Sequence, residues 1–171
     1  MAGSLIKINE SIVSSAVPSV TLTGIDSTYD VYMVSHNNVL LSAASYLYLR
    51  LTESGTPNTT ANYDVAYKQL KAQTTFANDS ATNWTYFISS TTMSTTAGTS
   101  NNANHYIFNA NNSSEYTFLT FEYSMISAAG NLQGAQGGGV FTVTSAVDGI
   151  QFYASSGNIV SGTFTLYSLK K

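Results

Sequence analysis

The sequence predicts an all-β protein: an antiparallel β-sandwich, jelly-roll-like, with at most one short helix. Only 9% of its residues are charged, whereas an ordinary soluble domain has roughly 25%. Ser, Thr and Asn instead supply about a third of the chain, and these residues favour turns and strand surfaces over helix interiors. The 12 Tyr and 8 Phe residues add to the preference for strands. Apolar residues also alternate with period two in short segments without a βαβ rhythm, as in sandwiches and jelly rolls.

The chain of 171 residues is expected to form a single domain over residues 1–171. Its hydrophobic fraction of 43% is enough to bury a core. Residues 1–15 are interpreted as an extended N-terminal arm or a first strand, because apolar residues at 5–13 are separated by polar ones. No composition shift or repeat indicates a second domain.

The first half of the chain contains three clear alternating segments: residues 20–23, 29–36 and 46–51. In the third, Leu47, Leu49 and Leu51 share one face, and Tyr46, Tyr48 and Arg50 share the other. This pattern predicts a half-buried strand with an aromatic outer face.

Residues 53–60 contain Gly, Pro and Asn and are predicted to be a loop. The following segment, 63–70, is ambiguous. Its apolar spacing of three, four and three residues fits a helix, but the alternation of Tyr63, Val65 and Tyr67 fits an edge strand. The strand is favoured because a lone short helix is marginal in water.

The second half is predicted to hold strands at residues 84–88, 105–109, 116–127 and 140–144. Residues 89–104, rich in Ser, Thr and Asn, are interpreted as a long surface loop. The glycine-rich residues 128–139 are interpreted as a flexible tip. Residues 150–154 and 164–168 alternate on either side of a Ser-Ser-Gly-Asn turn and predict a terminal hairpin.

The charge pattern argues against nucleic acid as a partner. The net charge is −3, Arg50 is the one arginine, and five lysines are scattered along the chain, so no basic stripe can form to neutralise phosphates. The chain has no cysteine for a disulfide or a thiolate metal site. No basic segment followed by an apolar run indicates a secretory signal, and no apolar stretch approaches the ~20 residues that span a bilayer. We therefore expect no membrane insertion.

No arrangement of residues predicts catalysis, a metal site or a cofactor. The two histidines, His36 and His105, lack a nucleophile elbow or metal-ligand spacing and are interpreted as surface or strand-end residues. Asp26 and Asp30 are interpreted as a turn cap and a solvated carboxylate, because they lack a calcium-loop pattern. Glu115 and Glu122 are expected on opposite faces of one strand, which argues against a glycosidase pair.

Surface character is the remaining functional signal. Aromatic side chains carry much of the energy of interfaces, and one group of them is predicted to form a docking or glycan-stacking surface: Tyr46, Tyr48, Arg50, Trp84 and Tyr86. The alternative, which the composition favours, is that these residues fill the second face of a sandwich or a seam between copies of the chain.

Several short motifs together resemble small β-sandwich virion proteins of tailed, especially marine, bacteriophages. They are Ser-Thr-Tyr-Asp-Val-Tyr at 27–32, Leu-x-Leu-Arg-Leu at 47–51, Ser-Gly-Thr at 54–56, Asn-Tyr at 62–63 and Gly-Thr-Phe-Thr-Leu-Tyr-Ser at 162–168. The resemblance covers most of the chain, although such proteins more often end in Leu-Tyr-Gly where this chain has Ser168. The group's roles are capsid decoration, head protrusion and tail or fibre tip, and no catalytic residue accompanies them.

The resemblance implies a non-enzymatic structural protein on the exterior of a virion assembled in the host cytoplasm. The first expectation is a capsid decoration or head-protrusion protein that acts by oligomeric docking. The expected oligomer is a homotrimer, and the expected partners are other virion proteins such as major capsid or tail proteins. The alternative is a carbohydrate- or receptor-binding, lectin-like module at a tail or fibre tip, whose partner would be a host surface glycan.

Overall fold

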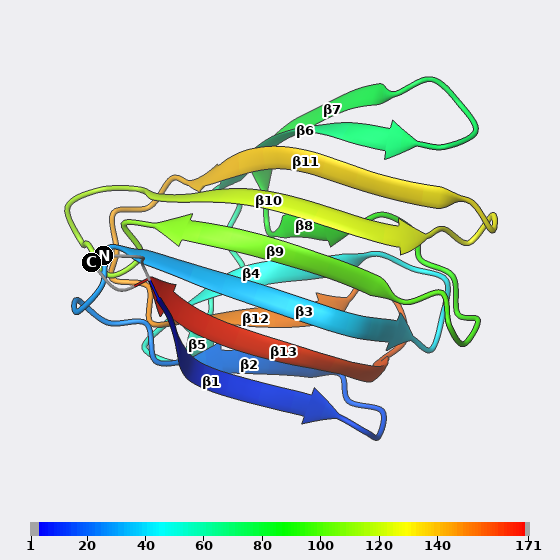
Figure 1. Ribbon diagram of the computed structural model, residues 1–171. Helices are drawn as coiled ribbons and strands as arrows, with labels where there is room; N and C mark the ends of the chain where they lie inside the picture. The colour runs from blue at the N-terminus through cyan, green and yellow to red at the C-terminus, as the bar shows by residue number, and fades with distance from the viewer. Residues whose placement is uncertain (1–3, 170–171) are drawn as a thin grey trace.

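The computed structural model describes residues 4–169, which form two antiparallel β-sheets and contain no helix (Figure 1). This confirms the predicted all-β class. Since these residues include no helix at all, none is long and apolar enough to cross a membrane. Residues 1–3 and 170–171 of the predicted single domain lie outside the described residues, and the first described strand begins at Leu5.

The larger sheet has eight strands. Their order across the sheet is β1 (Leu5–Val13), β13 (Ile159–Leu169), β3 (Val31–Leu41), β9 (Asn101–Phe108), β10 (Thr117–Ile126), β11 (Leu132–Phe141), β6 (Tyr63–Lys71) and β7 (Ala77–Trp84). The ambiguous segment at 63–70 is thus a strand, as favoured, and the N-terminal segment pairs as a first strand.

The smaller sheet has five strands: β2 (Ser19–Thr23), β12 (Gly149–Ala154), β4 (Leu47–Glu53) and β5 (Thr56–Pro57) in order, with β8 (Phe87–Ser90) also paired to β4. The predicted loop at 53–60 includes the two-residue strand β5. In Figure 1 the smaller sheet lies against one face of the larger, and the β6–β7 hairpin projects at the top of the view beyond β11.

The core lies between the sheets and consists of the side chains that alternate inward from both. Leu47, Leu49 and Leu51 of β4 are fully buried, as the alternation predicted. The largest other fully buried apolar side chains come from both sheets: Leu22, Tyr32, Leu41, Tyr63, Phe87, Ile88, Phe141, Phe152 and Phe164.

Two predictions about the second half of the chain are wrong. Residues 150–154 and the C-terminal strand do not form a hairpin, because β12 pairs with β2 and β4 while β13 pairs with β1 and β3 in the other sheet. The predicted surface loop at 89–104 is shorter: Ser89 and Ser90 are buried in β8, and β9 begins at Asn101. Alternating sequences do not distinguish a strand that pairs with its neighbour from one that crosses to the facing sheet.

The prediction of a flexible tip in the glycine-rich segment is also wrong, because residues 132–141 form β11 between β10 and β6. Its glycines serve close packing. A Cβ on Gly137 would lie 2.3 Å from the Cβ of Tyr67, and a Cβ on Gly139 would lie 2.6 Å from the ring of Phe87. Glycine in a strand interior commonly marks such a close approach.

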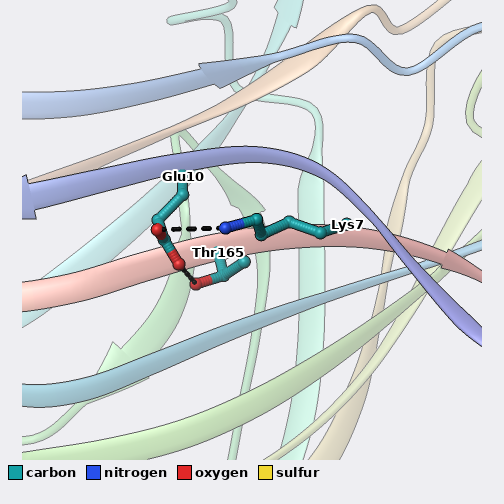
Figure 2. A network of polar contacts seen from close by, with 3 residues as sticks. All are labelled: Lys7, Glu10 and Thr165. Carbon is teal, nitrogen blue, oxygen red and sulfur yellow. Dashed lines mark hydrogen bonds and ion pairs between the residues drawn. The ribbon is translucent and has the colours of Figure 1, made fainter.

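The edge strand β1 carries a small polar network on its outer side (Figure 2). The pairing of β1 with β13 shifts between Lys7 and Asn9, so a bulge brings Lys7 and Glu10 to the same side although they are three residues apart. Lys7 Nζ lies 3.3 Å from Glu10 Oε1, and Thr165 Oγ1 donates to Glu10 Oε2 at 3.3 Å. Charge and a bulge on an edge strand oppose pairing with other chains.

Candidate functional site

The predicted aromatic surface is assembled by three separate parts of the fold. Tyr46 and Tyr48 lie beside and on β4, on the face opposite the buried leucines, so they point away from the core. Trp84 ends β7, and Tyr86 immediately precedes β8. The five-residue segment 84–88, predicted to be one strand, is therefore a crossing from the larger sheet to the smaller one.

The crossing has a local cause in the sequence. Asn83 has a φ of 58°, a left-handed conformation that asparagine tolerates better than most residues. Its backbone N–H donates to Asp64 Oδ1 at 2.8 Å. This bend ends β7 and turns the chain towards β4.

The aromatic rings form a continuous row. The Tyr48 and Tyr86 rings are stacked with centroids 3.7 Å apart and planes at 14°, while Tyr46 stacks on Tyr48 at 5.8 Å and Trp84 contacts Tyr86 at 5.0 Å. Such stacks hold each ring in a fixed orientation. Tyr46 keeps 37% of its surface exposed, so the row is a partly open surface and does not belong to the core.

Arg50 belongs to this site as a positioning residue. Its Nε donates to the carbonyl of Thr85 at 2.9 Å, within the crossing that carries Trp84 and Tyr86. Its guanidinium carbon lies 4.3 Å from the ring centroid of Tyr153, which in turn packs edge-on against Tyr48. Arginine suits this role because its planar group can stack and donate hydrogen bonds at once.

The row of rings lines a cleft of about 640 Å³, within the usual size range of small-molecule sites. The β6–β7 hairpin, whose last residue is Trp84, also provides a second wall with Tyr67, Gln69 and Asp79, called the facing wall below. The cleft residues are Tyr46, Tyr48, Tyr67, Gln69, Asp79, Trp84, Tyr86, Ile88, Thr91, Thr92, Ser127, Ala128, Ala129 and Gln133.

The facing wall is polar. Asp79 on β7 pairs in register with Tyr67 on β6, and Asp79 Oδ2 accepts hydrogen bonds from Tyr67 Oη at 2.8 Å and from Gln69 Nε2 at 3.3 Å. At the end of the cleft, Thr91 Oγ1 donates to Gln133 Oε1 at 3.2 Å. These oxygens and nitrogens retain further capacity for hydrogen bonds with a ligand.

Two tyrosine hydroxyls of the cleft, those of Tyr48 and Tyr67, are held protonated. Burial, reinforced by its hydrogen bond with Tyr86, raises the pKa of Tyr48 well above its ordinary value. Burial and the hydrogen bond to Asp79 raise the pKa of Tyr67 in the same direction. The hydroxyls therefore remain neutral hydrogen-bonding groups across the ordinary pH range.

Sequence reasoning found the aromatic wall and missed the polar one. All five predicted residues lie in one region, with Arg50 behind the cleft and the other four lining it. Gln69, Asp79 and Gln133 were not singled out, because nothing in the sequence indicates that the β6–β7 hairpin faces β4. The predicted loop at 89–104 contributes Thr91 and Thr92, and the predicted tip at 128–139 contributes Ala128, Ala129 and Gln133.

The prediction that His36 and His105 are surface or strand-end residues is wrong, because both are fully buried between the sheets. The Ser89 hydroxyl lies between them, 2.9 Å from His36 Nε2 and 3.1 Å from His105 Nε2. The rings are packed against Phe152, Phe164 and Phe121. They form a polar cluster inside the core and are separate from the cleft.

The acidic candidates also lie outside the cleft. Asp26 is a turn cap as expected, because its Oδ1 accepts the Thr28 N–H at 2.8 Å. Glu115 precedes β10, and Glu122 is exposed on β10. Asp79 is the one carboxylate among the described residues that line the cleft, and residues 4–169 hold no group of three or more His, Cys, Asp or Glu side chains arranged for a metal ion.

Comparison of the chain with protein-family models and with curated proteins finds no match. The geometry of the cleft is therefore the main guide to function.

Proposed function

We propose that this chain is a non-enzymatic, lectin-like module that binds carbohydrate in the aromatic cleft, on the exterior of a virion of the tailed-phage type. The observation that carries the glycan part is that one cleft is lined by two unlike sets of groups: a row of four aromatic rings, and carboxylate, amide and hydroxyl groups. The virion part is supported by the sequence motifs that resemble phage structural proteins.

The two walls match the two sides of a pyranose. A sugar ring presents apolar C–H groups on its faces, which pack on aromatic rings, and hydroxyl groups around its edge, which need hydrogen-bond partners. Gln69, Asp79 and Gln133 offer such partners in the same cleft as Tyr48 and Trp84.

The single carboxylate supports binding over cleavage. Glycoside hydrolysis by the usual mechanism uses two carboxyl groups on either side of the scissile bond. Asp79 has no second carboxylate opposite it among the described cleft residues.

Trp84 provides a direct assay, because it is the one tryptophan of the chain and lines the cleft. A glycan array would identify a ligand, and titration of that glycan should change the tryptophan emission in a saturable way. Tyr48→Ala should weaken binding at least about tenfold, the loss expected from an aromatic contact of 1.4 kcal/mol or more.

Ile12→Ala is the matched control, because Ile12 is 69% exposed on β1 and lies outside the cleft lining. This variant should bind as the wild type does. Equal losses in the Tyr48 and Ile12 variants, or no binding to any glycan on the array, would refute the proposal.

Oligomeric docking is a second candidate, supported by apolar exposure on the opposite side of the molecule. Phe118 and Tyr106 are 47% and 37% exposed on the face of the larger sheet that points away from the core. Phe118 pairs in register with Phe108 and Val140 on its two neighbouring strands. An exposed apolar group of this kind is typical of an interaction surface.

Light scattering of the purified chain tests this candidate. A homotrimer that dissociates in Phe118→Ser but not in Tyr48→Ala would support docking through this face. A wild-type chain that stays monomeric at the highest soluble concentration, and does not co-purify with capsids, would refute it.

A further inference from the structure

The charge of the cleft is one-sided. Asp79 is the one ionised side chain among the described residues that line it, and no lysine, arginine or histidine does so. A bound anion would therefore face a carboxylate without a compensating cation. Two like charges a few ångströms apart in a partly desolvated site repel by one to several kcal/mol.

The nearby cation is already engaged. Arg50 lies behind the aromatic row, where its Nε is bonded to the Thr85 carbonyl and its guanidinium is stacked on Tyr153. Turning it towards a ligand would break both contacts. Lys68 likewise lies on the hairpin with its Nζ 5.8 Å from the Phe76 ring centroid, and it is not part of the cleft lining.

The remaining polar groups are suited to uncharged hydroxyls. Tyr67 Oη and Gln69 Nε2 are oriented by Asp79, and Thr91 and Gln133 are bonded to each other. Amides and hydroxyls both donate and accept, as sugar hydroxyls do. They do not supply the charge-assisted bonds by which proteins usually recognise carboxylate, sulfate or phosphate.

We infer that the cleft selects neutral pyranose oligosaccharides and excludes glycans that carry carboxylate, sulfate or phosphate groups. This inference rests on the proposed glycan-binding function and names its ligand class. The physical basis is the juxtaposition of the Asp79 carboxylate with a row of aromatic rings, and the absence of a cationic side chain among the described residues that line the cleft.

The test uses one polysaccharide backbone in three forms. A neutral polysaccharide that binds on the array is oxidised at its primary hydroxyls to carboxylates, and part of the oxidised material is converted to neutral methyl esters. Affinity of the full-length protein for each form is measured by tryptophan fluorescence and by calorimetry at low and high salt. The ester controls for loss of the primary hydroxyl without a charge.

The acidic form should bind about tenfold or more weakly than the neutral form at low salt, and the ester should recover most of that loss. High salt should narrow the difference, because salt screens repulsion. Asp79→Asn should also reduce the difference in affinity between the neutral and acidic forms. Glu122→Gln changes an exposed carboxylate of β10 outside the cleft, so it should leave that difference unchanged.

An acidic form that binds as tightly as the neutral one, or an Asp79→Asn variant with an undiminished difference, would overturn the inference while leaving glycan binding in place. Failure of every backbone to bind in any form would instead refute the proposed function, and the inference with it.

Discussion

Lowering the pH should destabilise this protein through its two buried histidines. His36 and His105 are fully buried and share the Ser89 hydroxyl through their Nε2 atoms. A serine hydroxyl has one hydrogen, so it donates to one ring and accepts from the other. In that arrangement the accepting ring carries its hydrogen on Nδ1 and the donating ring carries one on Nε2, and burial favours the neutral form of both rings.

The size of the effect follows from the pKa values. Burial lowers the pKa of His105 to about 4, and burial together with the neighbouring His105 holds the pKa of His36 well below its ordinary value. In the unfolded chain both titrate near 6.5. The unfolded state thus binds more protons below pH 6.5, and stability decreases as pH falls from there towards the folded-state pKa.

Each such histidine lowers the free energy of unfolding by about 1.4 kcal/mol per pH unit in that window. For His105 the sum down to its folded-state pKa is about 3 kcal/mol, a large fraction of the 5–15 kcal/mol typical of a domain. Above pH 6.5 these histidines should add no pH dependence. With no cysteine in the chain and carboxylates titrating mainly below about pH 5, the interval between pH 6.5 and about 5 reports on the histidines.

Urea unfolding at a series of pH values measures this slope. His105→Gln removes one titrating group, so it should reduce the slope by about 1.4 kcal/mol per pH unit whatever its effect on stability at neutral pH. Ile107→Val is the control, because Ile107 is fully buried on the same strand and its truncation should lower stability equally at every pH. If the wild type has the same stability at pH 7 and pH 5, or if both variants keep its slope, the reasoning is wrong.

Three further predictions concern packing and positioning. Gly137→Ala should lower the free energy of unfolding by about 1–3 kcal/mol, because the new methyl group would overlap Tyr67; Gly138→Ala, where the nearest atom is 3.3 Å away, should cost less in the same denaturation assay. Tyr63→Phe should cost about 1–2 kcal/mol, because the Tyr63 hydroxyl donates to the Asn58 carbonyl at 2.9 Å inside the fold; an unchanged midpoint of thermal unfolding would contradict this. Arg50→Lys should keep the charge but lose the fixed stacking on Tyr153, so glycan affinity should fall while the unfolding midpoint changes little; equal affinity of this variant and the wild type would contradict a positioning role.

The part of the fold that the sequence predicted is which side chains of a strand face the core, because apolar residues alternate with polar ones along it. Leu47, Leu49 and Leu51 face the core because a strand places every second side chain on the same side. The same rule placed Tyr46 and Tyr48 together on the outer face. Neither result depends on which strands become neighbours.

The sequence pattern did not predict which strands pair with one another. The Ser-Ser-Gly-Asn turn at 155–158 resembles a hairpin turn, yet it connects β12 of one sheet to β13 of the other. The glycines of β11 resemble a tip, yet their lack of side chains admits Tyr67 and Phe87. The burial of the histidines was unpredictable for the same reason, because the Ser89 hydroxyl that contacts their Nε2 atoms lies in another sheet.

The location of the cleft depends on the crossing between β7 and β8, which the sequence pattern did not predict. If residues 84–88 were one strand, Trp84 and Tyr86 would lie on one face of one sheet, and no second wall would face them. Because Asn83 bends the chain and Arg50 holds Thr85, Trp84 stays with the β6–β7 hairpin while Tyr86 stacks on Tyr48 of the other sheet. The aromatic row thus spans from one sheet to the other, and the hairpin that supplies Asp79 is held opposite it. A cleft at this place follows from the crossing itself, and sequence periodicity within either strand does not contain that information.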